Sequence, residues 1–219
     1  EEERELALML LIDISGSQRV GSKEQLKKEL IAELSAVIAF SAIQNNDKIG
    51  ALFFTSKTEL FIPPAKGKKH ILRIIRELIE FEPSESQTDI SEALRHYTNA
   101  IKKRSIGFLL SDFKTENKEG LEKALKITNN RHDLVAVRIK DKNEEELPNV
   151  GFMNFKDSET GKRKWINTAS KKQRIKYKAN ALRNDSEIKE ILRKSGVDFT
   201  TVNTDESYIK PLMDLFKHR

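Results

Sequence analysis

The stretch ALMLLIDISGS, residues 7–17, decides the fold of this chain, because an apolar run ends there abruptly in polar side chains. The run predicts a buried strand. Asp13, Ser15 and Ser17 alternate at its end, so an extended backbone would point all three side chains the same way. Three hard oxygen donors suit Mg²⁺ or a similar cation, and open α/β sheets bind ligands at the carboxyl edge of their strands. An ordinary Asx or Ser turn explains the same residues equally well.

The composition narrows the class of protein. The 219 residues include no cysteine, which excludes disulfides, thiolate zinc sites and cysteine nucleophiles together. This fits a reducing compartment, and we predict a cytoplasmic location. No apolar run reaches the roughly 18 residues of a membrane helix, and no signal-peptide pattern is visible. The length predicts a single domain, residues 1–219, with a substantial core.

Apolar runs alternate with helical patterns along the chain. We predict further strands at residues 49–54, 59–62, 105–110, 134–139 and 197–202, and helices at 23–45, 68–81, from 90 onward, at 121–128, at 171–194 and near the end. This alternation predicts an α/β fold with a Rossmann-like, doubly wound, mostly parallel central sheet. The turn at 55–58 is too short for a parallel crossover, so 59–62 is expected to be one antiparallel edge strand that Pro63 and Pro64 end.

The helical spacing also predicts which side chains are buried. The inward stripe of the first helix includes Leu30, Ile31, Leu34, Val37 and Ile38, and that of the closing helix includes Ile209, Leu212, Met213 and Phe216. Regularity lapses after residue 141, where residues 150–155 and 164–167 predict a hairpin outside the main sheet, with Trp165 packed under it. We therefore expect an inserted hairpin and basic helix at about 141–194.

Positive charge is concentrated in this insertion. Lys and Arg number 40 against 34 Asp and Glu, a net charge of +6, and residues 160–183 contain many basic but no acidic side chains. Such a block could contact nucleic acid, an acidic partner or anionic lipid, although it is more often a solvated helix face. We favour docking to an acidic patch of a partner protein through Lys171, Lys172 and Arg174. Nucleic-acid binding through this helix is an alternative, but Trp165 and Tyr177 form no stacking motif.

Further polar residues are expected beside the first strand end. Asp112 follows the strand at 105–110, and Thr88 directly precedes a helix. In a doubly wound sheet, these loops and helix starts share one edge, so Asp13, Ser15, Ser17, Thr88 and Asp112 can converge. Each residue alone could be a cap; Asp89 with Glu92, for example, forms a good capping box. Five at one edge are hard to explain by capping.

This pattern resembles a known kind of site. D-x-S-x-S after the first strand, a Thr in the second loop and an Asp after the fourth strand resemble the metal-ion-dependent adhesion site of von Willebrand factor type A domains. Nearly the whole chain is similar, more specifically, to the bacterial domain-of-unknown-function family 58. The segments that carry this similarity are LIDISGS, AVIAFSAIQNNDKIGALFF, FIPPAKGKKHILRIIREL, TDISEAL, KRSIGFLLSDF, RHDLVAVRI, ELPNVGF and NTDESY.

The resemblance implies one Mg²⁺, or Mn²⁺ or Ca²⁺, at the top of the sheet. Its direct or water-mediated ligands would be Asp13, Ser15, Ser17, Thr88 and Asp112. The resemblance also implies a partner protein that supplies an acidic residue to the metal, usually a MoxR-type AAA ATPase, in chaperone-like or complex-assembly roles. Two carboxylates leave a dication able to attract a third. Gln18 replaces the family's usual methionine, at a position that is not a ligand.

A metal-dependent phosphohydrolase or nuclease is the alternative function. Phosphatases that open with Asp after a strand usually need a second carboxylate two positions later, where this chain has Ser15. The histidines are not spaced as metal ligands are, and they do not fit the pattern of a catalytic triad. We expect His96 and His132 at the surface or its boundary. The chain has no P-loop sequence. We therefore predict a non-enzymatic interaction module without a small-molecule substrate.

Overall fold

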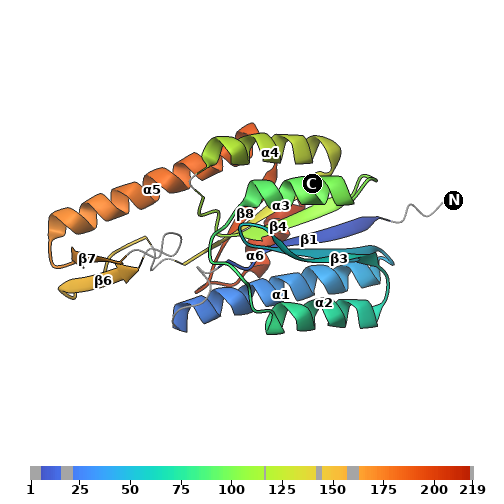
Figure 1. The fold of residues 1–219 in the computed structure, drawn as a ribbon, viewed down its shortest axis with the longest axis horizontal. Helices are drawn as coiled ribbons and strands as arrows, with labels where there is room; N and C mark the ends of the chain where they lie inside the picture. Colours follow the sequence, from blue (N-terminus) through green and yellow to red (C-terminus); the bar gives the residue numbers. More distant parts are fainter. Residues whose placement is uncertain (1–5, 16–21, 116, 142–144, 157–162, 218–219) are drawn as a thin grey trace.

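A six-stranded sheet with helices on both faces forms the body of the protein in this computed structural model (Figure 1). The structure describes residues 6–15, 22–115, 117–141, 145–156 and 163–217. The strands are β1 (Ala7–Asp13), β2 (Lys48–Phe54), β3 (Thr58–Ala65), β4 (Ile106–Ser111), β5 (Asp133–Lys140), β6 (Phe152–Lys156), β7 (Arg163–Asn167) and β8 (Asp198–Asn203). The helices are α1 (Ser22–Gln44), α2 (Lys68–Glu80), α3 (Ile90–Ala100), α4 (Lys118–Arg131), α5 (Lys171–Lys194) and α6 (Ile209–Lys217).

The strand order of the sheet is β3-β2-β1-β4-β5-β8. Neighbouring strands are parallel except β2 and β3, which pair antiparallel. The predicted class, α/β with a mostly parallel sheet and one antiparallel edge strand, is confirmed. From β1 the chain builds outward to β2 on one side and later to β4 on the other. The order therefore reverses between β1 and β4, and open α/β sheets bind ligands at such a switch point.

Each face of the sheet buries its own apolar cluster, because successive strand residues point to opposite faces. Leu10 belongs to the cluster that α1, α2 and α6 cover. Leu11 belongs to the cluster under α3, α4 and the C-terminal part of α5. Figure 1 shows α1 and α2 on one side of the sheet and α3 and α4 on the other. β1 is thus covered on both faces, which explains why its sequence is apolar up to its last residue, Asp13.

Strand β3 continues through Pro63 and Pro64 to Ala65, beyond the end that the prolines predict. Proline is tolerated here because β3 is an edge strand, where a missing N–H on the outer side removes no ladder hydrogen bond. The pairing with β2 also shifts between Ile49–Ala65 and Ala51–Ile62, so the prolines lie in a bulge.

Some side chains predicted to be buried are exposed. Val37 of α1 is 45% exposed, and Ile209, Met213 and Phe216 of α6 are about half exposed. Each helix contacts the sheet along a narrower stripe than its apolar pattern suggests, so the flanks of the stripe face outward. Val37 and Phe216 instead line an open groove between α1 and α6, with a volume of about 480 Å³.

The hairpin of β6 and β7 forms outside the main sheet, as predicted, beside the N-terminal end of α5 (Figure 1). The predicted position of Trp165 is wrong, because this side chain is 66% exposed and so not packed under the hairpin. Phe152, its diagonal neighbour across the hairpin, is equally open. Ile175 and Leu182 of α5 are also exposed, whereas Ile188 and later residues reach the core. We name the hairpin and the first half of α5, residues 152–184, the arm.

Asp185 fixes α5 to the sheet. Its Oδ1 accepts hydrogen bonds from Arg138 Nη1 at 2.5 Å and Lys140 Nζ at 2.8 Å, both on β5. Its Oδ2 pairs with Lys189 at 2.8 Å. Burial disfavours the charged carboxylate, but the hydrogen bonds from Lys140 and Lys189 and the charge of Arg138 hold the pKa of Asp185 far below its ordinary value.

A helix that spans a membrane must be both long and strongly apolar. Among the residues that the structure describes, none of the helices meets both requirements.

Replacement of the Asp185 anchor should destabilise the protein. Asp185→Asn is expected to lower the free energy of unfolding by about 3 kcal/mol, because it leaves the buried Arg138 charge uncompensated. Urea denaturation followed by circular dichroism measures the change. Glu190→Gln is the control: its pair with Lys194 is exposed, so it should cost less than about 0.5 kcal/mol. Equal losses in the two variants would contradict the anchoring role.

Candidate metal centre

The carboxylates of Asp13 and Asp112 lie at the ends of two neighbouring strands, at the switch point of the sheet. Asp13 is the last residue of β1, and Asp112 follows Ser111, the last residue of β4. The Ser111 hydroxyl donates a hydrogen bond to Asp13 Oδ2 at 2.6 Å and so joins the two strand ends. Both aspartates are buried, with 1% and 7% exposure. The topology therefore brings the two predicted acidic residues together.

The two buried carboxylates differ in their electrostatic surroundings. Burial raises the pKa of Asp13 to about 6 and the negative charge of Asp112 adds to this rise, so that the two together outweigh the hydrogen bonds from Ser111 and Ser15. Burial also acts to raise the pKa of Asp112, but the ammonium groups of Lys114 and Lys27, together with the hydrogen bond from the Lys114 backbone N–H, outweigh it, so this pKa is lowered. An added cation beside Asp13 would relieve an unfavourable charge.

Ser15 adds a third oxygen to the cluster. Its backbone N–H donates to Asp13 Oδ1 at 3.0 Å, which holds the two residues in a tight turn. Ser15 is 1% exposed, and its hydroxyl, although near the Asp13 carboxylate, makes no hydrogen bond of good geometry within the described residues. Buried hydroxyls normally have a partner, so this oxygen fits the role of a metal ligand.

Thr88 lies at the same edge, in the loop before α3. The Asp89 N–H donates to the Thr55 carbonyl at 2.9 Å, and the Ile14 N–H donates to the Phe54 carbonyl at 2.9 Å. The loop that carries Thr88 and the end of β1 are therefore both attached to the end of β2. The Asp89 side chain caps α3 by accepting from the Glu92 N–H, so Thr88 is not needed as the cap. Ser17 and Gln18 lie outside the described residues.

Two lysines that the sequence patterns did not mark lie beside Asp112. Lys27 of α1 donates to Asp112 Oδ2 at 3.3 Å and is 1% exposed. Lys114 Nζ lies 3.4 Å from the same oxygen, and its backbone N–H donates to Oδ1 at 3.2 Å. A signal for Lys27 was available: it precedes Leu30 and Ile31 by three and four residues, on the buried stripe of the helix. Ser111 likewise directly precedes the predicted Asp112.

The donor chemistry fits a hard dication. Within the residues that the structure describes, no three His, Cys, Asp or Glu side chains gather as a metal-binding group. The oxygens present are two carboxylates and a hydroxyl, a set that suits Mg²⁺ or Mn²⁺ with water in the remaining positions. Asp13, Ser15 and Asp112, with Thr88 from the neighbouring loop, are the described residues that would hold such an ion, and the predicted ligand Ser17 lies outside the described residues.

The described histidines serve other contacts. His70 Nε2 lies 2.9 Å from the Ile49 carbonyl oxygen, and the half-buried His96 packs on Phe61, at the boundary as predicted. His132 is fully buried, so the surface or boundary position predicted for it is wrong. Its ring stacks on Tyr97, and its Nδ1 lies 3.1 Å from Ser105 Oγ. The ring fills the space beside Tyr97, which sequence spacing could not reveal.

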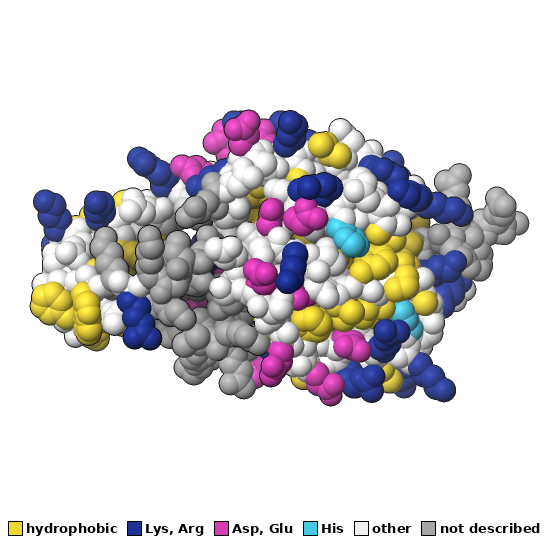
Figure 2. All heavy atoms as spheres, in the orientation of Figure 1, with side chains coloured by type: hydrophobic (Ala, Val, Ile, Leu, Met, Phe, Trp, Pro, Cys, Tyr) yellow, Lys and Arg dark blue, Asp and Glu magenta, His cyan; other side chains and the backbone are white. Residues whose placement is uncertain are grey.

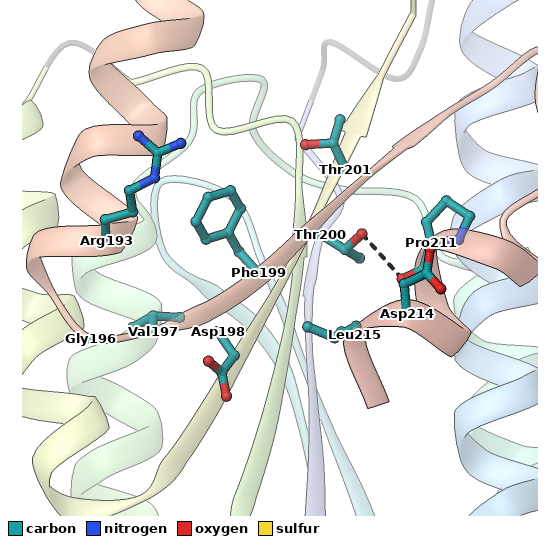
Figure 3. A pocket seen from close by; sticks show the side chains of 10 residues that line it. All are labelled: Arg193, Gly196, Val197, Asp198, Phe199, Thr200, Thr201, Pro211, Asp214 and Leu215. Carbon is teal, nitrogen blue, oxygen red and sulfur yellow. Dashed lines mark hydrogen bonds between the residues drawn. The ribbon is translucent and has the colours of Figure 1, made fainter. Parts of the chain in front are cut away.

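A separate groove of about 700 Å³ lies at the β8 edge of the sheet (Figure 3). Arg193 of α5 borders it on one side of β8, and Asp214 and Leu215 of α6 border it on the other. Thr200 on β8 donates to the Pro211 carbonyl at 3.3 Å. The groove follows the open edge of the sheet around this strand, and none of the predicted site residues lines it.

Comparison with solved structures identifies the fold. BatB, a conserved hypothetical protein of Bacteroides thetaiotaomicron, aligns over 97% of both chains with a TM-score of 0.61 and 16% identity. A von Willebrand factor type A protein from Catenulispora acidiphila aligns over 98% of this chain and 42% of its own, with a TM-score of 0.55 and 11% identity. The fold is therefore von Willebrand factor type A-like, as the sequence resemblance implies.

The family follows from the sequence match. The model of the family "Protein of unknown function DUF58" matches residues 1–187, and the chain belongs to this family. The uncharacterized protein Rv1480 of Mycobacterium tuberculosis is 25% identical over 161 residues, which cover 73% of this chain and 50% of that protein. The chain thus spans about half the length of this relative.

The buried histidine gives the protein a defined pH dependence. Burial, with Arg131 and Arg104, lowers the pKa of His132 from 6.5 to about 4. Between these values the unfolded chain binds a proton that the folded protein does not. The free energy of unfolding should therefore fall as the pH drops through this window, by up to about 1.4 kcal/mol per unit. Urea titrations at several pH values measure the slope.

The variant His132→Phe should lose this contribution to the slope and remain folded, because phenylalanine can keep the stacking on Tyr97. His96→Phe serves as the matched control, since His96 is only half-buried, and it should keep the slope of the wild type. A slope in His132→Phe as steep as in the wild type would contradict the assignment.

Proposed function

We propose that this protein is a metal-dependent protein-interaction module. It would bind one Mg²⁺, Mn²⁺ or Ca²⁺, and an acidic residue of a partner protein would complete the coordination shell of this ion. The supporting observation is the buried cluster of Asp13, Ser15 and Asp112 at the switch point, where the Ser15 hydroxyl lies near the Asp13 carboxylate without a hydrogen bond of good geometry within the described residues. When bound, the ion supplies a positive charge that attracts a further carboxylate.

The protein's own residues give this centre a fixed shape. β1 is buried on both faces, so the strand that presents Asp13 has little freedom to move. The Ser111 hydroxyl and the Ser15 N–H each orient one oxygen of the Asp13 carboxylate. Such pre-organisation lowers the ordering cost when a metal and a partner carboxylate bind.

The proposal includes a MoxR-type AAA ATPase as the partner, in a chaperone-like or complex-assembly role, because the family resemblance implies it. The arm offers a second contact surface. Lys171 and Lys172 are exposed, whereas Arg174 donates to the Thr168 and Ala169 carbonyls and so secures the start of α5. Figure 2 shows lysine and arginine side chains beside an apolar patch at the end of the molecule where the arm lies in Figure 1.

The arm and the candidate metal centre lie at the same end of the sheet. Asp185 binds Arg138 and Lys140, which stand at the carboxyl end of β5, and residues 171–184 of α5 extend outward from there (Figure 1). Asp13 and Asp112 lie at the carboxyl ends of β1 and β4. One partner could therefore contact the metal and the arm together, which supports a protein-interaction role over a catalytic one.

Nucleic-acid binding through the arm is the second candidate. The exposed Trp165 and Phe152 favour it, because aromatic side chains beside positive charges can stack on bases. Binding of a single-stranded oligonucleotide with a steep salt dependence would support this reading. The phosphohydrolase alternative has less support, since Ser15 stands where a second carboxylate is usual; a phosphatase screen with Mg²⁺ examines it directly.

The proposed metal ligand Asp13 can be tested by the response to Mg²⁺. In EDTA at pH 7.5, Asp13→Asn should be more stable than the wild type by about 1–2 kcal/mol, because it removes a buried charge that Asp112 repels. Millimolar Mg²⁺ or Mn²⁺ should stabilise the wild type, by about 1.4 kcal/mol at ten times Kd, and leave the variant unchanged. Thermal unfolding and calorimetry measure both effects.

The matched control is Asp89→Asn, which changes a carboxylate at the same edge that caps α3. It should keep the metal response of the wild type. Equal responses of wild type and Asp13→Asn to metal would contradict the proposed ligand role.

The partner surface can be tested by charge reversal. The double variant Lys171→Glu, Lys172→Glu should bind a purified MoxR-type ATPase at least about tenfold more weakly, because two attractive charges become repulsive. Biolayer interferometry with Mg²⁺ and with EDTA measures this and the metal dependence together. Lys102→Glu, Lys103→Glu reverses two exposed lysines in the loop after α3 and should leave binding intact. Unchanged binding of the arm variant would refute the docking surface.

A further inference from the structure

Lys27 is an unusual residue because its ammonium group is buried inside the candidate metal centre. Its side chain is 2% exposed, and its Nζ lies 3.3 Å from Asp112 Oδ2, on a carboxylate that is itself only 5% exposed. Lysine is seldom fully buried unless it is paired, since removal of an ammonium ion from water is costly. The helical stripe of α1 carries this charge inward to the end of β4.

The lysines change the charge of the centre. Asp13 and Asp112 contribute two negative charges, and Lys27 and Lys114 contribute two positive charges within reach of Asp112. Lys114 is 37% exposed, so solvent and salt screen its charge, whereas the buried charge of Lys27 is screened much less. A dication that enters the cluster therefore meets the fixed positive charge of Lys27, which is already paired with Asp112.

We infer that Lys27 is a tethered cation that competes with the metal ion for Asp112, so that metal and an acidic partner bind cooperatively. This inference rests on the proposed metal-dependent function. The Lys27 ammonium compensates Asp112 when the metal is absent and lowers the affinity for the metal alone. A partner carboxylate adds the negative charge that the occupied centre needs. By linkage, the carboxylate must strengthen metal binding by the same factor as the metal strengthens carboxylate binding.

A purely structural role for Lys27 makes a different prediction. If the ammonium only holds α1 against β4, its removal should destabilise the protein and leave metal affinity unchanged or weaker. A competing cation predicts the opposite for the metal, because the removed charge no longer repels it. Metal affinity therefore separates the two roles, while stability alone does not.

The test compares Mn²⁺ binding by wild type, Lys27→Met and Lys27→Arg, with calorimetry and the electron paramagnetic resonance signal of free Mn²⁺. Lys27→Met should bind Mn²⁺ at least about tenfold more tightly, because a weakly screened like charge is removed. Lys27→Arg keeps the charge and should stay close to the wild type. Lys28→Met is the matched control: this neighbouring lysine donates to the Ile79 carbonyl, outside the cluster.

Acetate serves as the probe for the partner carboxylate. Saturating acetate should tighten Mn²⁺ binding by the wild type and have a smaller effect on Lys27→Met, which no longer carries the competing charge. Circular dichroism confirms that each variant is folded, and Lys27→Gln provides the same comparison in case the methionine variant does not fold.

The outcomes separate the inference from the proposed function. If wild type binds Mn²⁺ and Asp13→Asn does not, while folded Lys27→Met binds no more tightly than wild type, the tethered-cation role is overturned and the metal centre stands. If neither wild type nor Lys27→Met shows binding that depends on Asp13, the metal centre itself is refuted. Tighter binding by Lys27→Met alone, with Lys28→Met unchanged, supports the competing cation.

Discussion

The repulsion between two buried carboxylates, Asp13 and Asp112, is the constraint on which this end of the molecule depends. Their strands are direct neighbours, so the sheet itself forces the charges together. Neighbouring side chains compensate these charges. The Ser111 hydroxyl donates a hydrogen bond to one oxygen of Asp13, and Lys27 and Lys114 form ion pairs with Asp112. Buried like charges are unfavourable unless a cation or hydrogen bonds compensate them. An arrangement that keeps them close despite this cost is typical of a binding site.

The fold could be predicted from the sequence because its signals are local and repeated. The apolar strand at 7–13 and the alternation of strands with helices define a doubly wound sheet without any long-range information. The errors occur where burial depends on a neighbour. Periodicity indicates which face of a helix or hairpin is apolar, but it cannot tell whether another element covers that face. Val37 and Trp165 are exposed for this reason, although both carry suitable side chains for a core.

The candidate site was predictable to the extent that topology alone places residues. Asp13 and Asp112 end parallel strands, so their proximity follows from the strand order. Lys27 was missed because a charged residue is ordinarily assigned to the surface, even on an apolar stripe. The buried His132 was missed for a similar reason: its ring stacks on Tyr97, and this contact joins α3 to the start of β5. Such polar contacts between distant elements leave no periodic trace in the sequence.

The arm is attached to the sheet at the edge that carries the candidate metal centre. Asp185 bonds Arg138 and Lys140 at the carboxyl end of β5, so the exposed half of α5 begins at the edge that also carries Asp13 and Asp112. Two modest contacts held in a fixed relation can bind one partner much more tightly than either alone. The ion pairs of Asp185 hold the start of the exposed half of α5 at this edge, so under the proposed function they also help to place the arm for such a second contact.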